Sequence, residues 1–325
     1  MKQKFKTLSV SDLDRTWKSV QYDLFLAALG YEERARYVAG LVGTVSKSRI
    51  AIGFSEQREH AYEANFKWFE DNEFEIAIID DDGFREKVGD SFRKAALQRE
   101  AETLRVLIDI SSLSRFRLAT IVDLLLTEII NISVSVTFVY SLATYNPPSI
   151  TRVSNSHVGP VLRSNFAGWW VEPDRGITAI VGLGYEPDKA LGAVEHLQAA
   201  DIWTFTPKSS IARYSKALGT ANGSLLASVP ISHQVTYSVQ SPFNLFVTLE
   251  SLVYGVMQQQ NPVLLPFGPK LFALCCLLVA SVHTSVAVWR VSAQALEPAI
   301  NRKASGHVYG LLVSFGPVEV TALAE

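Results

Sequence analysis

Short apolar runs alternate with amphipathic stretches along most of the chain. In the first half the apolar runs predict strands, and the stretches between them have the three- and four-residue spacing of helices. The predicted strands are residues 22–28, 49–54, 74–79, 104–110 and 134–140. The predicted helices are residues 32–42, 61–69, 84–101 and 116–130, with 80–83 expected to close the third strand. This regular alternation predicts parallel strands joined by right-handed crossovers.

The alternation stops at residues 146–176, which contain four prolines, and then resumes. The later predicted strands are residues 177–181, 202–206, 235–239, 263–265 and 285–291, and the later predicted helices are 187–197, 211–218, 245–258 and 271–281. The expected fold class is therefore α/β, with two tandem Rossmann-like units of mainly parallel sheet. Their expected extents are 1–145 and 176–325, with 146–175 as a closing segment and connector. The opening residues, to about Thr16, are expected to be peripheral.

An internal repeat relates the two halves. Four landmarks recur in the same order: Leu29-Gly30-Tyr31-Glu32 with Leu183-Gly184-Tyr185-Glu186, Asp82-Gly83-Phe84 with Ser241-Pro242-Phe243, Ile110-Ser111-Ser112 with Phe267-Gly268-Pro269, and Pro148-x-Ile150-x-Arg152-(x)4-His157-Val158 with Pro298-x-Ile300-x-Arg302-(x)4-His307-Val308. The distance from the first glycine to the histidine is 127 residues in one half and 123 in the other. Matching order and spacing indicate an internal duplication.

Composition limits the class of protein. The 325 residues are 48% hydrophobic and 19% charged, which predicts globular domains with large cores. The net charge of −2 argues against a general nucleic-acid-binding surface, although 30 Lys and Arg residues leave room for a local groove. The adjacent cysteines Cys275 and Cys276 are expected to be buried and to form neither a disulfide nor a metal site. Residues 1–6 lack the apolar core of a signal sequence, so a cytoplasmic location is expected.

A membrane segment is not expected. The apolar run 271–289 is long enough to suggest one, but Ser281, His283, Thr284 and Ser285 divide it into a helix and a following strand. A spanning helix would bury those polar groups in hydrocarbon.

The recurring positions predict a ligand surface. Ligands of open parallel sheets bind at the carboxyl ends of the strands, where loops meet helix N-termini and backbone amides face outward. Most of the landmarks fall at such turns, with hydroxyls and cations close in sequence. The candidate ligand-binding residues are Gly30, Tyr31, Glu32, Ser111, Ser112, Arg115, Arg152, Gly184, Tyr185, Glu186, Gly268, Lys270 and Arg302. Glycine, serine and glutamate at these turns are also common as caps, tight turns and helix-dipole partners.

Catalytic motifs are weak. Asp109, His157 and His307 are candidate acid/base groups, although Asp109 could instead orient the serine turn that follows it and the histidines could be structural. The Arg-(x)4-His spacing matches HEPN ribonucleases, but nearby prolines and a predicted strand at 307–315 argue against their helical bundle. Gly182-Leu-Gly184 starts a dinucleotide-binding pattern that Pro187 breaks. No nucleophile elbow, P-loop, zinc-protease motif or paired CxxC occurs, and no cofactor or metal is predicted.

The second half resembles a CARF domain, the CRISPR-associated Rossmann-fold sensor, over residues 177–291. The resemblance lies in the opening strand with Gly184-Tyr-Glu-Pro187, the strand–helix order, and the turn Pro266-Phe-Gly268-Pro-Lys270. CARF proteins carry a Gly-Gly-Thr-Lys-like turn there, so Gly268 and Lys270 fit, whereas Phe267 and Pro269 depart. The resemblance implies paired domains that hold a cyclic oligonucleotide between their carboxyl edges.

The sequence thus predicts a prokaryotic, defence-associated protein that binds a nucleotide-like or other anionic ligand between two Rossmann-like halves. Its expected partners are that ligand and a protein carrying effector activity, with a homodimer as a further possibility. Two alternatives remain open: an enzyme acting on a nucleotide or nucleic acid through Asp109 and His157 or His307, and a scaffold subunit of a multi-protein complex.

Overall fold

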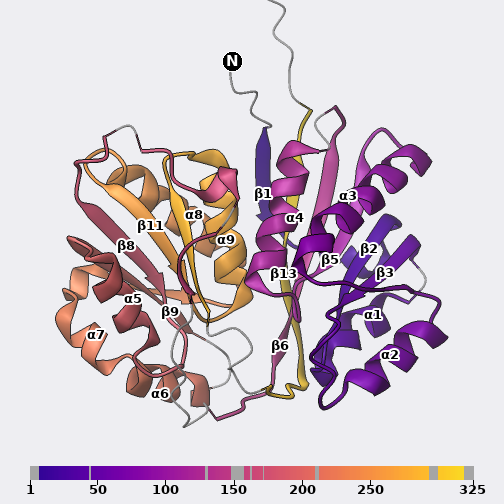
Figure 1. Cartoon of the computed structure of the whole chain (residues 1–325), viewed down its shortest axis with the longest axis horizontal. Coiled ribbons are helices and arrows are strands. Elements are labelled where there is room, and N and C mark those ends of the chain that lie inside the picture. The colour runs from indigo at the N-terminus through magenta and orange to yellow at the C-terminus, as the bar shows by residue number, and fades with distance from the viewer. Residues whose placement is uncertain are drawn as a thin grey trace, which may run out of the picture. The chain divides into compact units, whose positions relative to one another are not determined.

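The computed structural model describes residues 7–43, 45–128, 131–147, 157–161, 163–170, 172–208, 212–292 and 299–317. It divides into two compact units, one formed by residues 1–143 with 301–325 and the other by residues 144–300 (Figure 1). Each unit is a mainly parallel sheet alternating with helices, so the predicted α/β class with two Rossmann-like units is confirmed.

Unit 1 contains a seven-stranded sheet in the order β1-β13-β6-β5-β2-β3-β4. The parallel strands are β2 (Tyr22–Leu29), β3 (Ser46–Gly53), β4 (Glu75–Ile78), β5 (Leu104–Asp109) and β6 (Val134–Ala143). The helical segments between them are η2 (Glu33–Arg36), α1 (Tyr37–Val42), α2 (Tyr62–Asp71), α3 (Asp81–Gln98) and α4 (Arg115–Thr127). Numbered along the chain, the parallel strands run 3-2-1-4-5, which places a topological switch point between β2 and β5.

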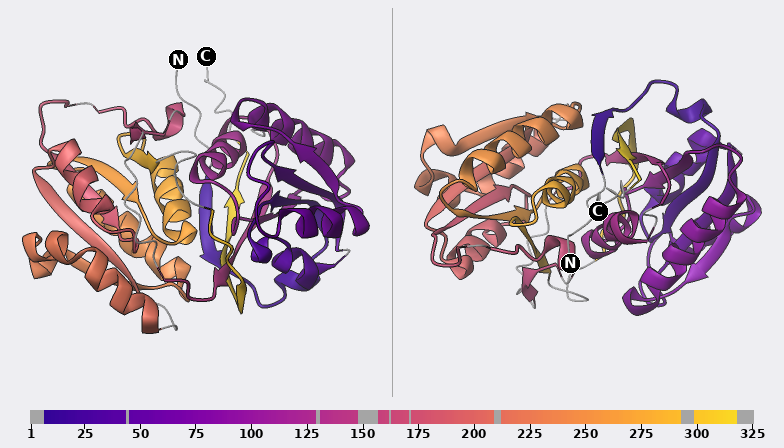
Figure 2. Two further views of the ribbon diagram at one scale, coloured as in Figure 1. Left: turned by 60° about the horizontal axis from the view of Figure 1, so that its bottom comes forward. Right: turned by 90° about the horizontal axis from the view of Figure 1, so that it is seen from above.

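The core of unit 1 follows from its central strands. Seven of the eight residues of β2 are buried, as expected for a parallel strand covered on both faces. Phe25, Ala27 and Leu29 pack in one cluster with residues of α1 and α2. Helices α3 and α4 pack against each other, and Figure 2 shows further views of these layers.

Unit 2 contains a six-stranded sheet in the order β10-β9-β8-β11-β12-β7. Its parallel strands are β8 (Ile177–Gly182), β9 (Asp201–Lys208), β10 (Gln234–Ser238), β11 (Asn261–Pro266) and β12 (Ala287–Ser292). Its helices are α5 (Lys189–Leu197), α6 (Ala212–Ala221), α7 (Gly223–Ser228), α8 (Pro242–Val256) and α9 (Lys270–Val282). The order of the parallel strands is again 3-2-1-4-5, so the two units share one topology.

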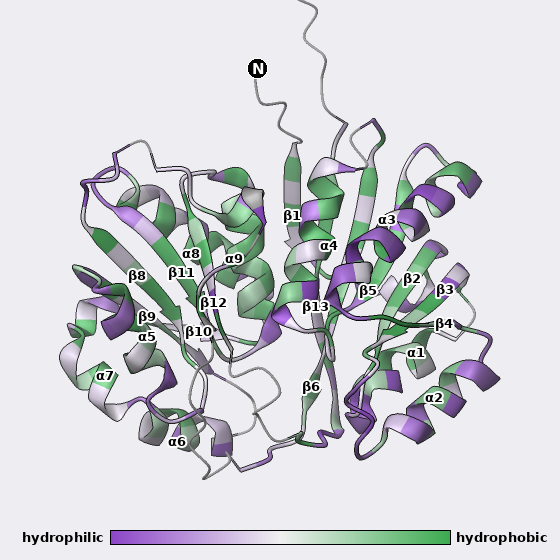
Figure 3. Cartoon of the chain, viewed as in Figure 1, coloured by the Kyte–Doolittle hydropathy of each residue, from purple (hydrophilic) through white to green (hydrophobic). Residues whose placement is uncertain are grey.

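Helix α9 is the segment that resembled a membrane span. Residues 271–280 are all buried, and the strongly apolar strands and helices of this unit are visible in Figure 3. Among the described residues, no helix is both long enough and apolar enough to cross a bilayer.

The antiparallel edge strands join other sheets than the expected domain organisation implies. Strand β13 (Ala304–Phe315), near the C-terminus, pairs with β6 of unit 1, and β1 (Leu8–Asp12) pairs with β13. Strand β7 (His157–Pro160), at the end of the first half, pairs with β12 of unit 2. The predicted boundaries therefore need correction, because residues 301–325 belong to unit 1 and the expected connector is part of unit 2.

One local expectation was also wrong. Residues 81–83 do not close β4 but form the first turn of α3, where the carboxylates of Asp81 and Asp82 interact favourably with the helix dipole. Residues 8–12, which were expected to be peripheral, form the outermost strand of the sheet, with side chains that are exposed or half-buried. The predicted strand at 307–315 is confirmed within β13.

Candidate functional site

Asp109 ends β5 at the switch point of unit 1 and is 2% exposed. The backbone N–H and the hydroxyl of Ser111 donate to Asp109 Oδ1 over 2.9 and 2.5 Å. The N–H of Ser141, on β6, donates in turn to Ser111 Oγ over 2.7 Å. The carboxylate thus holds the turn after β5 against the neighbouring strand, which is the structural role considered for it from the sequence.

Glu32 lies in the turn after β2, where two arginines hold its carboxylate. Arg34 Nε donates to Oε2 over 2.5 Å and Arg302 Nη1 to Oε1 over 2.7 Å. Arg34 is 4% exposed and also donates to Ser141 O over 2.8 Å. Burial alone would lower the pKa of the Arg34 guanidinium, but the charge and the hydrogen bond of Glu32 help to outweigh burial, so the pKa lies above its ordinary value.

The amides of this turn are occupied by the chain itself. The N–H of Glu33 donates to Asn301 Oδ1 over 2.8 Å, and the N–H of Arg34 donates to Arg302 O over 3.1 Å. Lys303 Nζ lies 3.4 Å from Glu33 Oε2. Two of the amides expected to face a ligand therefore bind the segment that leads into β13.

A buried asparagine supports the first turn in each unit. Asn65 on α2 is fully buried, and its Nδ2 donates to the carbonyl oxygens of Gly30 and Glu32, both over 2.8 Å. Asn222, between α6 and α7, donates to Gly184 O over 2.7 Å. The asparagines follow their glycines by 35 and 38 residues. This equivalence adds a landmark that the sequence comparison missed, and only its similar spacing could have revealed it.

Two glycines close the switch point of unit 2. Gly268 has φ +68°, and a Cβ there would overlap Leu183 O. A Cβ on Gly184 would lie 3.0 Å from Gly268 N. The turns after β8 and β11 therefore meet backbone to backbone, which requires glycine at both positions in unit 2. Lys270 begins α9 beside this contact, whereas Glu186 is exposed.

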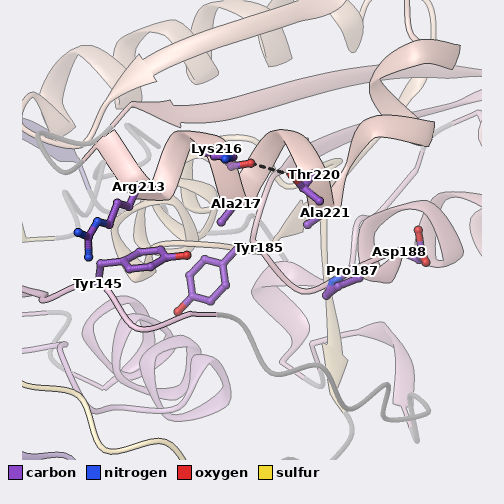
Figure 4. Close-up of a pocket in the computed structure, with 9 residues that line it drawn as sticks. All are labelled: Tyr145, Tyr185, Pro187, Asp188, Arg213, Lys216, Ala217, Thr220 and Ala221. Carbon is purple, nitrogen blue, oxygen red and sulfur yellow. Dashed lines mark hydrogen bonds between the residues drawn. The ribbon is translucent and has the colours of Figure 1, made fainter.

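A cavity of about 620 Å³ opens beside the first turn of unit 2. Its lining residues are Tyr145, Tyr185, Pro187, Asp188, Arg213, Lys216, Ala217, Thr220 and Ala221 (Figure 4). They come from three segments: the chain after β6, the turn after β8, and helix α6, which follows β9. The cavity therefore lies by the carboxyl ends of β8 and β9, within unit 2.

Two of the lining residues, Tyr145 and Tyr185, are tyrosines whose rings both pack against Tyr214. The ring of Tyr214 lies 5.1 Å from that of Tyr145 and 5.8 Å from that of Tyr185, and its hydroxyl donates to Thr144 O over 3.0 Å. Figure 4 shows the rings of Tyr145 and Tyr185 beneath α6, with Arg213 beside Tyr145. Packing among the tyrosines holds the two lining rings in place.

The cavity is charged as well as aromatic. Arg213 and Lys216 lie one turn apart on α6, and both are exposed. Within the described part of the chain, neither forms an ion pair. Asp188, at the opposite end, has a left-handed backbone (φ 60°), and its N–H donates to Ala221 O over 3.3 Å. Of the residues predicted from the sequence, only Tyr185 lines this cavity.

The candidate acid/base residues lie on different elements. His307 is an exposed residue of β13, its ring stacked 6.2 Å from that of Tyr309, and β6 separates this strand from Asp109 on β5. His157 begins β7 in the other sheet, where its backbone pairs with Ser292. Arg152 lies outside the described residues. No catalytic constellation links these residues in the described ranges, and their catalytic role stays a prediction.

The other candidate ligand-binding residues of unit 1 lie after the carboxyl ends of β2 and β5. The Ser112 side chain lies against Gly30, and its buried Oγ has no hydrogen-bond partner among the described residues. Tyr31 is half-buried, with its ring 6.2 Å from that of His60, and Arg115 begins α4. Ligand binding by these residues also stays a prediction.

Metal-ligating side chains do not gather in the described ranges, where no group of three His, Cys, Asp or Glu residues could hold an ion. Neither Cys275 nor Cys276 is in a disulfide, and both are fully buried.

Comparisons with known proteins do not assign the chain to a family. No protein-family model matches it, and no curated protein is similar to it in sequence. One solved structure that aligns with it is the T. thermophilus 16S rRNA N2 G1207 methyltransferase (RsmC) in complex with AdoMet and guanosine, at 8% identity over 95% of this chain and 98% of that one. The TM-score of 0.19 is too low to carry an argument about fold or function.

Proposed function

We propose that the chain binds a nucleotide-like anion in the cavity of unit 2. The observation that carries this proposal is that one open cavity combines two tyrosine rings with two cations, Arg213 and Lys216, neither of which forms an ion pair among the described residues. Its volume, about 620 Å³, lies in the range of small-molecule sites, roughly 300–1,000 Å³.

The chemistry of the lining matches the two ends of a nucleotide. Tyr145 and Tyr185 offer aromatic faces on which a planar base can stack. Arg213 and Lys216 can form charge-assisted hydrogen bonds to phosphate oxygens. Asp188 offers carboxylate oxygens that can accept hydrogen bonds from sugar hydroxyls. The carboxyl edge of a parallel sheet is also where Rossmann-like proteins hold such ligands.

The two units differ at the turn that follows their first parallel strand. In unit 1 the equivalent turn has two of its amides hydrogen-bonded to residues 301–302 and its carboxylate paired with two arginines. We therefore propose that unit 2 is the ligand-binding half. We propose that this binding serves a sensor in antiviral defence that acts through a partner protein, as the CARF resemblance implies. The location that we propose for it is the cytoplasm.

Thermal unfolding of the full chain with added ligands tests the proposal. Mononucleotides and cyclic oligonucleotides should raise the melting temperature, since a ligand that binds only the folded state stabilises it by mass action. Nucleosides and inorganic phosphate, each matching only one end of the cavity, should raise it less. The absence of any shift across the nucleotides at millimolar concentration would refute the proposal.

A further inference from the structure

The last strand of each repeat leaves the sheet of its own repeat. The first repeat runs from β2 to β7 (residues 22–160), and the second runs from β8 to β13 (residues 177–315). Each consists of five parallel strands with helical connections and one antiparallel strand. Strand β7 completes the sheet of the second repeat, and β13 completes the sheet of the first. The exchange is reciprocal.

Unit 1 depends on residues of the second repeat for part of its core. Nine residues of β13 pair with β6, eight of them in one continuous register, and Leu311, Val313 and Phe315 are fully buried. Just before β13, Arg302 donates a hydrogen bond to the Glu32 carboxylate. Within β13, Gly306 O accepts a hydrogen bond from the Tyr37 hydroxyl over 3.4 Å.

Unit 2 depends in the same way on the end of the first repeat and the residues after it. Four residues of β7 are in register with β12, and the N–H of Val161 donates to Val288 O over 2.8 Å. Phe166 is fully buried, and Gly168 lies so close to Ala287 that a Cβ there would overlap it.

We infer that the two repeats form a strand-exchanged pair that stays together without the peptide link between them. The outer edge of β6 pairs with β13, and the outer edge of β12 pairs with β7 and bridges to Ala167. Without these segments each sheet would expose an unpaired strand edge and lose buried side chains, so the repeats complete each other. This inference does not depend on the proposed ligand.

Cleavage of the full chain between the repeats tests the inference. Pro173 and Asp174 form an exposed turn, where a specific protease site can be inserted. After cleavage the two fragments should co-elute on gel filtration at the mass of the intact chain and separate only in denaturant. Separation in native buffer at micromolar concentration would overturn the inference.

Two variants of the cleaved chain show whether the exchanged strands hold the fragments. A Cβ at position 310 would overlap Phe138 O, so Gly310→Ala should speed hydrogen exchange in β6 at least tenfold and leave β12 unchanged. Phe166→Ala should speed exchange in β12 and leave β6 unchanged. Gly192→Ala, where the added Cβ has no neighbour within 4 Å, is the control and should change neither. Unchanged exchange in β6 for Gly310→Ala and in β12 for Phe166→Ala would overturn the inference even if the fragments co-elute.

Discussion

Replacement of Glu32 by alanine should destabilise unit 1 strongly. The carboxylate is 8% exposed and pairs with Arg34, which is 4% exposed, and with Arg302, which is 24% exposed. Glu32→Ala leaves the buried Arg34 guanidinium without its counter-charge. Removing one partner of a buried ion pair costs about 3–5 kcal/mol, because the other charge stays buried and uncompensated.

Native-state hydrogen exchange measures this loss locally. Amides of β2 and β5 report on unit 1, and amides of β8 report on unit 2. A loss of about 3–5 kcal/mol corresponds to exchange about two to four orders of magnitude faster in the unit 1 strands, at about tenfold for each 1.4 kcal/mol. Adding Arg34→Met to Glu32→Ala should restore part of the stability, since it removes the unpaired charge.

Glu33 provides the matched control. Its side chain is 41% exposed and its partner Lys303 is 68% exposed, so Glu33→Ala should cost at most about 1 kcal/mol. If Glu32→Ala cost no more than Glu33→Ala, or if the double variant were no more stable than Glu32→Ala, the argument from buried charge would be wrong.

Three further predictions follow from buried groups. Asn65→Ala should destabilise unit 1, and Asn222→Ala should destabilise unit 2, each by about 1–3 kcal/mol because carbonyl oxygens lose their hydrogen bonds. Hydrogen exchange should therefore become faster in β2 for the first variant and in β8 for the second. If either variant affected both strands equally, the two asparagines would not have equivalent roles in their own units. Burial raises the pKa of Tyr22, whose hydroxyl donates to Trp17 O over 2.8 Å, so its contribution to stability is complete below pH 10 and falls as the pH rises above that value. In alkaline denaturation Tyr22→Phe should flatten this dependence, and an unchanged profile would count against it. Burial also raises the pKa of the Cys275 thiol, so a thiol reagent should label it only when unit 2 opens, and rapid labelling of the native chain would contradict its burial.

The architecture of the parallel sheets was predictable from local pattern. Buried parallel strands are continuous apolar runs, and the helices between them have their own spacing, so both signals lie within short windows of sequence. The long apolar run at 271–289 was correctly divided into a helix and a strand by its central polar residues. The helical start at Asp81 was missed because consecutive aspartates resemble a loop, although they suit a first helical turn.

The exchanged strands could not be predicted in this way. Pairing of β13 with β6 joins residues more than 160 positions apart, and an apolar strand carries no local sign of which edge it will join. The match between Arg152 and Arg302 was visible in the sequence, but it was read as a landmark within each half. In unit 1 the structure pairs Arg302 of the second repeat with Glu32 of the first.

The candidate site was predicted only in part. Sequence comparison found Tyr185 because it lies in a repeated turn. Tyr145, Arg213 and Lys216 were missed because they belong to no repeated motif and come together only through packing of α6 beside the first turn of unit 2. A search for repeated residues finds those that shape the fold in both units, such as Gly30 and Gly184. Most of the residues that line the cavity occur in unit 2 alone, so such a search misses them.

Calorimetric titration of the full chain with a nucleotide that stabilises it tests the central claim most directly. The experiment compares the unaltered chain with Arg213→Gln/Lys216→Gln and with Lys94→Gln, which neutralises an exposed lysine of α3 in unit 1. Hydrogen bonds to charged groups contribute about 1.5–3 kcal/mol, so the cavity variant should bind at least about tenfold more weakly. Lys94→Gln should bind as the unaltered chain does. Equal affinity in all three proteins would contradict binding in the unit 2 cavity.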